Sequence, residues 1–209
     1  MSYIIVGLGN PGEEYKDTRH NAGRIVLEYF AQKHALPEFK QHIKSKALVS
    51  KGEITVGNTT ENVELVEPNN FMNRSGSSVA TLAGIGMLTS KASATKKAHN
   101  IIVIYDDLDL PLGSIKISFN RSSGGHRGVE SIIKSVKTQE FIRVRVGICP
   151  LTPAGKPKKP QGETDVEKFI IGPFKKNELE ELNKIAKDVA EALELIMFET
   201  KERAMEKFN

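Results

Sequence analysis

Residues Ile101-Ile102-Val103-Ile104-Tyr105 form a continuous apolar run. Such a run is typical of a strand that is buried on both faces, because a half-exposed strand alternates apolar and polar residues. A strand of this kind needs helices on each side of its sheet. The run therefore favours an α/β fold with helices on both faces of a sheet.

Strand and helix patterns alternate along most of the chain, which favours one three-layer α/β domain over residues 1–209 with a mixed or parallel sheet. Further strands are predicted over 3–6, 47–49, 54–56, 63–66, 114–119 and 141–148, and helices over 21–34, 77–85, 128–136 and 176–207. Residues 88–100 lack an apolar period, and residues 151–165 are rich in proline and glycine. We expect both of these segments to be flexible loops.

The composition is that of an ordinary globular domain, with 39% hydrophobic and 27% charged residues in 209. No apolar run approaches the roughly 20 residues of a membrane span, and no signal peptide fits before the first strand. The single cysteine, Cys149, excludes an intrachain disulfide and fits a reducing compartment. A net charge of +4 is weak support for a polyanionic partner.

The first predicted strand leads into a glycine-rich stretch, residues 7–23, that carries Asn10 and His20. Ligand sites of α/β folds favour the carboxyl ends of strands. Imidazole is the side chain whose ordinary pKa best suits proton transfer near neutral pH. The stretch is therefore the first candidate for a catalytic segment.

The same stretch matches the dinucleotide-binding pattern G-x-G-x-x-G at Gly7, Gly9 and Gly12. We reject this interpretation, because that motif needs a helix to begin within the glycine run, where its amide groups meet phosphate. Here Pro11 removes an N–H group, and two glutamates follow Gly12. The next helix is predicted to begin only near residue 21.

Three later polar clusters also follow predicted elements, and they lie at residues 71–76, 106–109 and 122–128. Asp106 can accept a hydrogen bond from His20 and so fix the tautomer of a base that activates water. His126 is the rival base, although its place at a helix start favours a packing or capping role. The sequence around the aspartates at 106, 107 and 109 is more typical of a structural turn than of a magnesium site. The chain has no G-x-S-x-G motif, so a serine-hydrolase mechanism is not indicated.

Six stretches follow one another between residues 5 and 148: Ile5-Val6-Gly7-Leu8-Gly9-Asn10-Pro11-Gly12 with Tyr15, Thr18-Arg19-His20-Asn21-Ala22-Gly23, Phe71-Met72-Asn73-x-Ser75-Gly76, Asp106-Asp107-Leu108-Asp109-Leu110-Pro111, Gly124-Gly125-His126-x-Gly128 and Arg143-Val144-Arg145-Val146-Gly147-Ile148. Together they resemble the motifs of the bacterial-type peptidyl-tRNA hydrolases, which also occur in eukaryotic organelles. Each stretch alone is modestly specific, whereas all of them in order are highly specific. The resemblance implies a single α/β domain with a mixed twisted sheet.

It also implies hydrolysis of the ester between a peptide and the terminal ribose of tRNA, which recycles the tRNA. On the matching positions, His20 is the base that activates water, Asp106 supports it, and Asn10 positions the substrate. The remaining implied contacts are substrate binding by Tyr15, Phe71, Asn73 and Arg127, and tRNA phosphate binding by Arg145 and Lys116. No metal or organic cofactor and no membrane partner is implied, and we expect a monomer in the cytoplasm or the mitochondrion.

Two departures from the family pattern bear on these roles. Arg127 stands where the family commonly has asparagine, so its role is open between tRNA phosphate and a peptide carbonyl. The clamp lysine of the family falls on Ser118, and Lys116, two residues back on the same strand face, is the substitute. The lysine-rich stretch 88–100 looks longer than the bacterial pattern and hints at a eukaryotic source.

Two other functional classes stay open at this stage. One is a related protein that has lost activity and only binds RNA, against which the intact His20 and Asp106 argue. The other is a peptidase or amidase that acts without RNA, against which Arg145 and the basic loops argue. A turnover assay on a blocked aminoacyl-tRNA separates all of these.

Overall fold

A computed structural model describes residues 2–85, 90–152, 155 and 157–209 of the chain. In this part of the chain, a seven-stranded sheet has the order β2-β3-β4-β1-β5-β7-β6. Strands β4, β1, β5 and β7 run parallel to one another, while β2, β3 and β6 pair antiparallel at the two edges. The sheet is therefore mixed, as predicted. Its strands are β1 (Ser2–Gly7), β2 (Lys40–His42), β3 (Ala47–Val56), β4 (Thr59–Pro68), β5 (Ile101–Pro111), β6 (Ile115–Phe119) and β7 (Ile142–Cys149).

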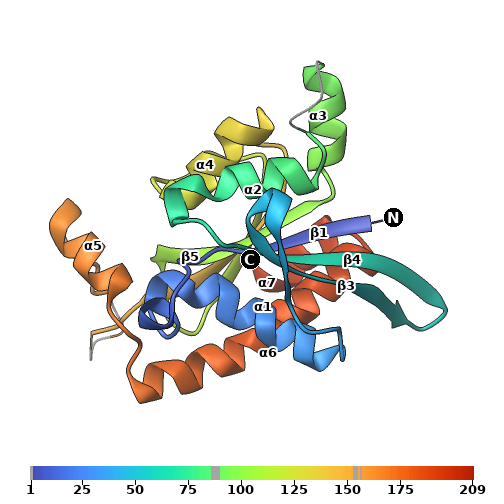
Figure 1. Cartoon of the computed structure of the whole chain (residues 1–209). Helices are drawn as coiled ribbons and strands as arrows, with labels where there is room; N and C mark the ends of the chain where they lie inside the picture. Colours follow the sequence, from blue (N-terminus) through green and yellow to red (C-terminus); the bar gives the residue numbers. More distant parts are fainter. Residues whose placement is uncertain (1, 86–89, 153–154, 156) are drawn as a thin grey trace.

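Helices cover both faces of this sheet, which confirms the three-layer α/β fold (Figure 1). Helices α2, α3 and α4 lie on one face, and α1, α6 and α7 lie on the other, while α5 stands at the side. No helix in the described ranges is long and apolar enough to cross a membrane. The helices are α1 (Ala22–Lys33), α2 (Ser75–Leu82), α3 (Lys91–Ala98), α4 (Arg127–Val136), α5 (Glu163–Ile171), α6 (Lys176–Phe198) and α7 (Lys201–Phe208), with short 3₁₀ turns η1 (Glu13–Tyr15), η2 (Arg19–Asn21), η3 (Ile43–Ser45) and η4 (Met72–Arg74).

The apolar run at the start of β5 is the centre of the molecule. Ile102 and Ile104 belong to the core between the sheet and α1 and α6, whereas Ile101, Val103 and Tyr105 belong to the core under α2 and α4. All of them are at most 4% exposed. The run is thus buried on both faces, as its composition predicted.

Two of the predicted loops contain helix. Residues 91–98 of the predicted loop 88–100 form α3, with Ala94 and Ala98 buried against the core. Alanine is so weak an apolar signal that the buried face shows no clear period in the sequence. The predicted loop 151–165 ends earlier than expected, since α5 begins at Glu163. Residues 88, 89, 153, 154 and Lys156 lie outside the described part of the chain.

The predicted C-terminal helix 176–207 is two helices. Helix α6 ends at Phe198, and α7 begins at Lys201 after Thr200 in extended conformation. The Thr200 hydroxyl accepts a hydrogen bond from the Arg203 backbone N–H, which is the usual capping bond of a new helix start. This break lets α7 turn back against β6, where the Asn209 side chain bonds the backbone of Ile117.

The glycines of the first motif allow a close approach between α1 and the sheet. A Cβ at Gly23 would lie 2.4 Å from the Ile104 carbonyl oxygen, and one at Gly9 would lie 2.7 Å from the Arg24 side chain. Since α1 begins at Ala22, no helix starts within the run Gly7–Gly12. The glycines therefore pack a helix against strands, which agrees with our rejection of a dinucleotide site.

Glu67, near the end of β4, is a buried carboxylate with an incomplete set of partners. Its side chain is 4% exposed, its Oε2 lies 4.0 Å from Arg24 Nη1, and its Oε1 has no hydrogen-bond partner among the described residues. Burial raises the pKa of Glu67 to about 7, against the opposing charge of Arg24. The folded chain therefore holds a proton that the unfolded chain releases near the ordinary value of 4.5.

The free energy of unfolding should therefore fall as the pH rises through this window, because unfolding then releases a proton. The loss should level off above about pH 7, at about 3 kcal/mol for a shift of this size. Glu67→Gln has no titrating group there, so it should gain about that much on the wild type between about pH 5 and pH 8. Urea unfolding at both pH values measures the gain, and a difference independent of pH would contradict it.

Candidate active site

The carboxyl ends of β1 and β5 open into a cavity of about 940 Å³. Polar side chains that the sequence predicted to act together meet on its walls, although they are up to 135 residues apart (145 − 10). Tyr15 is not among the residues that line the cavity; it lies in η1, where its carbonyl accepts bonds from Thr18. The predicted site residues on the wall are Asn10, His20, Phe71, Asn73, Asp106, Lys116, Arg127 and Arg145.

Asp106 forms hydrogen bonds with two imidazoles, and all three side chains line the cavity. Its Oδ1 lies 2.9 Å from His20 Nδ1 and 3.1 Å from His126 Nε2, and its Oδ2 lies 3.1 Å from His20 Nδ1. All three side chains are nearly buried, at 3–9% exposure. The predicted His20–Asp106 pair is thus present as a hydrogen bond, and His126 is a second hydrogen-bond partner of the same carboxylate.

The hydrogen bonds assign the neutral tautomer of each imidazole. His20 Nδ1 faces a carboxylate and so carries the proton, which leaves the lone pair of Nε2 for another group. His126 Nδ1 accepts from the Val129 backbone N–H, 3.3 Å away, so its Nε2 carries the proton toward Asp106. His126 therefore has both nitrogens in use, whereas His20 keeps one for chemistry.

Two imidazole partners also settle the charge of Asp106. Burial alone raises the pKa of Asp106, but the charges and hydrogen bonds of His20 and His126 outweigh burial and hold the pKa well below its usual range. The group stays ionised whenever the imidazoles donate to it. An ionised carboxylate at this point accepts the hydrogen bond from His20 Nδ1 and so fixes the orientation of the ring.

His20, Asp106 and His126 also lie close enough to share a metal ion, with ligand atoms within 4.8 Å of one another. In the structure, however, the facing nitrogen of each imidazole donates its proton to the carboxylate. A metal at that point would have to displace both protons. The geometry fits a hydrogen-bonded network better than a metal centre.

The Asn10 amide is oriented by the backbone on its far side. Its Oδ1 accepts a 2.9 Å hydrogen bond from the Met72 N–H, and its own backbone exchanges two bonds with the Asn21 side chain. The acceptor oxygen is therefore fixed, and Nδ2 is the end that remains for a ligand. Asn10 thus presents a neutral N–H donor in the same cavity as His20.

Strand β5 continues past Asp106, which corrects the prediction of a tight turn at the Leu-Asp-Leu-Pro sequence, residues 108–111. It runs to Pro111 with a shift of register against β7 between Asp107 and Pro111. Before that shift, Asp107 is paired with Gly147, two residues along β7 from Arg145, and Asp107 Oδ2 lies 2.6 Å from Arg145 Nε. Asp109 likewise pairs with Lys159. Both carboxylates are thus occupied by basic side chains.

Lys116 and Arg145 are direct partners across β6 and β7. Residues paired in this way share one face of a sheet, so the predicted geometry for Lys116 is confirmed. Both residues line the cavity, with Lys116 exposed and Arg145 24% exposed at its side chain. Ser118, at the family's lysine position, pairs with Arg143.

Arg127 contacts protein carboxylates in this structure. From the start of α4 it reaches α5, where Nη2 lies 2.8 Å from Glu163 and Nη1 lies 3.8 Å from Glu167. Its side chain is 57% exposed, so the two ion pairs contribute little stability. All three residues line the cavity, so the ion pairs join α4 to α5 at its wall, a contact that the sequence did not indicate.

Helix α5 is anchored at its other end by Arg19. The Arg19 guanidinium donates to the carbonyls of Phe169 and Gly172 and to Glu178, and it stacks 4.4 Å from the Phe169 ring centroid. Arg19 directly precedes His20, so the end of α5 is tied to the segment that carries His20. Val166 and Ile170 of α5 consequently line the cavity.

Sequence reasoning missed α5, and for His126 it favoured a packing or capping role over that of a rival base. The signal for α5 was the apolar spacing of Val166, Phe169 and Ile170 directly after a proline-rich stretch. His126 does cap α4, as predicted, but it also bonds Asp106. Only the fold brings the end of β5 to the start of α4.

Three comparisons place this chain among known proteins. Residues 4–209 match the family model described as peptidyl-tRNA hydrolase. The peptidyl-tRNA hydrolase of Carboxydothermus hydrogenoformans is 38% identical over 207 residues, 99% of this chain and 98% of that protein. That of Aquifex aeolicus is 37% identical over 210 residues, 99% and 95% of the two chains. The crystal structure of the Acinetobacter baumannii enzyme has a TM-score of 0.79 at 28% identity, covering 99% of this chain and 94% of that one.

The likeness extends over nearly the whole length of both sequences, beyond the motifs that lie within residues 5–148. It supports an ester hydrolase, and neither an RNA-binding protein without activity nor a peptidase finds support in these matches. By the family model, the relatives and the fold, this chain belongs to the bacterial-type peptidyl-tRNA hydrolases.

Proposed function

We propose that this peptidyl-tRNA hydrolase cleaves its ester by activating a water molecule at His20. The observation that carries the proposal is the hydrogen bond from His20 Nδ1 to Asp106, which leaves Nε2 as a base in the cavity. A base with one nitrogen held by a buried carboxylate has a fixed orientation and a supported charge in its protonated form. The network needs no metal or organic cofactor.

The proposed reaction has two proton transfers. His20 Nε2 takes a proton from water as the water oxygen attacks the acyl carbon, and an oxyanion forms on the former carbonyl oxygen. The bond from the acyl carbon to the ribose oxygen then breaks, and His20 returns the proton to that ribose oxygen. The products are a peptide with a free carboxyl group and a tRNA with a free terminal hydroxyl.

Asn10 and the segment around Asn73 are proposed to hold the acyl group. The free Nδ2 of Asn10 is a neutral donor that suits a developing oxyanion or the blocked amine of the substrate. Asn73 and Phe71 are exposed on η4 and at its start, where a peptide backbone and side chain can reach them. Tyr15 has no place in this proposal, because it does not line the cavity.

The tRNA is proposed to bind with phosphate near Arg145 and Lys116. Their shared sheet face supports this, since two adjacent cations form a geometry that one phosphate can bridge. To bind a phosphate, Arg145 would have to break its hydrogen bond with Asp107 or share its guanidinium between Asp107 and the phosphate. Arg127 is proposed to exchange its exposed ion pairs with α5 for a substrate group when tRNA enters.

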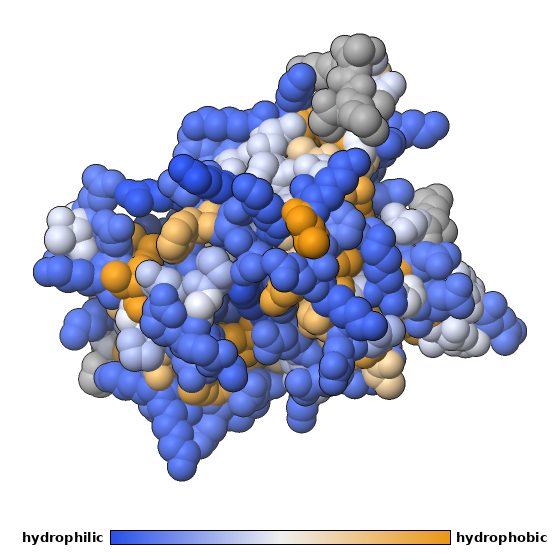
Figure 2. Space-filling model, in the orientation of Figure 1, coloured by the Kyte–Doolittle hydropathy of each residue, from blue (hydrophilic) through white to orange (hydrophobic). Residues whose placement is uncertain are grey.

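We also propose that the chain acts as a single domain and as a monomer, in the cytoplasm or in mitochondria. All the proposed site residues come from one chain, and the face in Figure 2 is largely hydrophilic with apolar residues in small separate patches. The lysine-rich stretch 88–100 supports a eukaryotic source. Sedimentation of the purified protein and fractionation of the source cell test the two statements.

Purified protein treated with a chelator should release an N-acetylated amino acid from tRNA at an undiminished rate and should largely spare free aminoacyl-tRNA. The reason is that the proposed base and its carboxylate are both protein groups. Acid-precipitable radiolabel over time measures both substrates. Loss of activity with chelator, restored by a divalent ion, would show that the base mechanism is wrong.

A further inference from the structure

A second hollow, of about 470 Å³, lies on the other side of the segment that carries Asn73. Phe71, Met72 and Asn73 line the catalytic cavity, whereas Asn70 and Arg74 line this hollow. The rest of its wall comes from the turn before β3 and from α2 and α4. The full lining is Lys44, Ser45, Lys46, Asn70, Arg74, Ser77, Thr81, Ser131 and Ser135.

The charged residues that line this hollow, the basic hollow, are all cations. Three of its lining residues, Lys44, Lys46 and Arg74, are cations, all are exposed, and the lining contains no carboxylate. Among the described residues none of the three cations forms an ion pair. Glu130, next to Ser131 in the sequence, pairs with Lys134 and does not reach the lining.

The catalytic cavity differs in this respect, although the whole chain is basic. There Arg127, Arg145 and Lys159 each pair with a carboxylate of the protein, whereas Lys116 and Arg121 form no ion pair among the described residues. The basic hollow has three unpaired cations and no carboxylate in its lining. Such a cluster favours a polyanion, because counterion release rewards each phosphate that a free cation neutralises.

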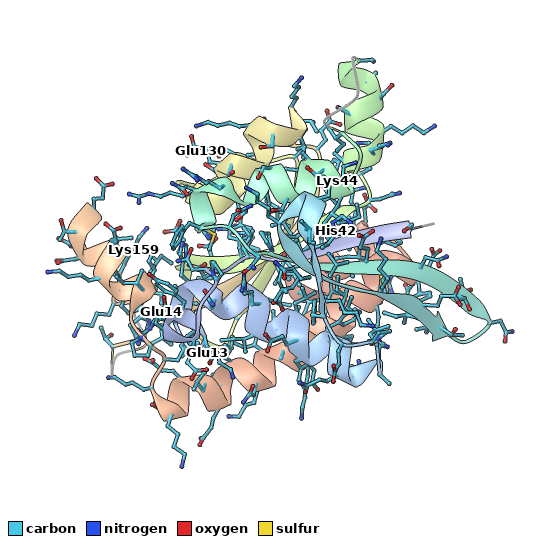
Figure 3. All side chains as sticks on the ribbon, viewed as in Figure 1. Glu13, Glu14, His42, Lys44, Glu130 and Lys159 are labelled. Carbon is cyan, nitrogen blue, oxygen red and sulfur yellow. The ribbon has the colours of Figure 1, made fainter. Side chains whose placement is uncertain are left out.

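Helices α2 and α4, which form part of the wall of the basic hollow, pack closely against each other. Gly76 of α2 packs on α4 so tightly that a Cβ there would lie 2.0 Å from the Ser131 carbonyl oxygen. The Gly76 N–H donates to Ser131 Oγ, which leaves the Ser131 hydroxyl proton free to donate to an anion. Turn η3 packs against α2, and Lys44 lies beside that helix in Figure 3.

Lys46 occupies a backbone conformation that glycine or asparagine adopts at lower cost. Its φ and ψ are 51° and 54°, in the left-handed region. The carbonyl of Lys46 accepts bonds from Asn69 and Ser78, which hold the turn in place. A lysine at such a position costs stability, so its side chain is a candidate for function.

We propose that the basic hollow binds backbone phosphates of the tRNA substrate, as a second contact beside the one at Arg145 and Lys116. The inference rests on peptidyl-tRNA as the substrate. Two contacts on either side of the 70–74 segment would fix the tRNA body while the acyl end enters the catalytic cavity. The hollow would thus contribute to affinity for tRNA and leave the chemical step unchanged.

The test compares the variant K44Q/K46Q/R74Q with the control K176Q/K184Q/K187Q, which loses the same charge from the exposed face of α6. Affinity for fluorescent deacylated tRNA is measured at a series of salt concentrations. The first variant should bind about tenfold more weakly at low salt, and its salt slope should be smaller by about 2 to 3, at 0.7 to 0.9 per contact. The control should stay near the wild-type slope, and hydrolysis of a blocked aminoacyl-adenosine should be equal in all three proteins.

An unchanged slope, or equal losses in both variants, would overturn the proposal. A changed rate on the blocked aminoacyl-adenosine would also overturn it, because the effect would then lie in the catalytic cavity. Lys46→Gly guards against misfolding, since it removes the charge at a position where glycine is the less strained residue. It should melt no lower than the wild type and flatten the salt slope by about one contact. Binding is measured with deacylated tRNA, so this result can be interpreted even if His20 is not the catalytic base.

Discussion

His20→Ala is expected to slow the hydrolysis of an N-acetylated aminoacyl-tRNA by about 10² to 10⁴, the usual value of a general base. Among the described residues, no protein group bonds Nε2 of His20, whereas both nitrogens of His126 are engaged, so His126 is no ready replacement. The fold should survive, because Asp106 keeps its hydrogen bond to His126 when the His20 ring is removed. Initial rates under saturating tRNA measure the loss in the chemical step.

The matched control is His34→Ala, which removes a half-buried imidazole that bonds Glu194 and does not line the cavity. It should keep the wild-type rate. Affinity for tRNA should be the same in both variants. A wild-type rate in His20→Ala would transfer the role of base to another group, although His126 has both nitrogens engaged.

Asp106→Asn is expected to cost less than His20→Ala, about one to two orders of magnitude in rate. The Oδ1 atom of Asp106 contacts both imidazoles, so an asparagine oxygen placed there keeps both bonds and both tautomers. What it loses is the negative charge that supports the protonated base, and the amide places an N–H group near His20 Nδ1. The catalytic base is retained but is weaker.

Rates of Asp106→Asn measured from acid to alkaline pH test whether the loss comes from the missing charge or from misfolding. A rate loss that persists under alkaline conditions, while the affinity for tRNA and the melting temperature stay at wild-type values, would separate charge support from misfolding. Rescue of the rate by Asp106→Glu is not expected, since the longer side chain cannot keep both bonds at 3–9% exposure. A loss as large as that of His20→Ala would mean that the tautomer of His20 has changed.

Much of the layered fold and the centre of the site could be predicted from local pattern. The run at 101–105 required burial on both faces, and the structure buries it on both. Parallel strands β1 and β5 end at the same edge, which is why Asn10, His20 and Asp106 meet although they lie in different motifs. Position at a strand end was therefore informative.

The remaining features depended on partners that only the fold brings together. Arg127 was expected to touch substrate, but α5 supplies Glu163 and Glu167 within its reach. The second role of His126 needed the end of β5 beside the start of α4. Helix α3 was missed because its buried residues, Ala94 and Ala98, are small.

Uncompensated charge is likewise invisible in a list of lysines. Lys159 and Lys44 look alike in the sequence, yet Asp109 pairs with the first, and the second lies in a hollow without carboxylates. The count of basic residues gave only a weak indication of a polyanionic partner. The fold places Lys44 beside two other cations in a hollow whose lining has no carboxylate, which a list of basic residues does not reveal.

The central claim is that water, activated at His20, attacks the acyl carbon of the ester. A single turnover of N-acetylated aminoacyl-tRNA in ¹⁸O-labelled water tests it most directly, with mass analysis of both products. The account predicts one ¹⁸O atom in the carboxyl group of the released N-acetyl amino acid, an unlabelled ribose hydroxyl, and release that is lost in His20→Ala. Label on the ribose oxygen, or undiminished labelled release by His20→Ala, would contradict it.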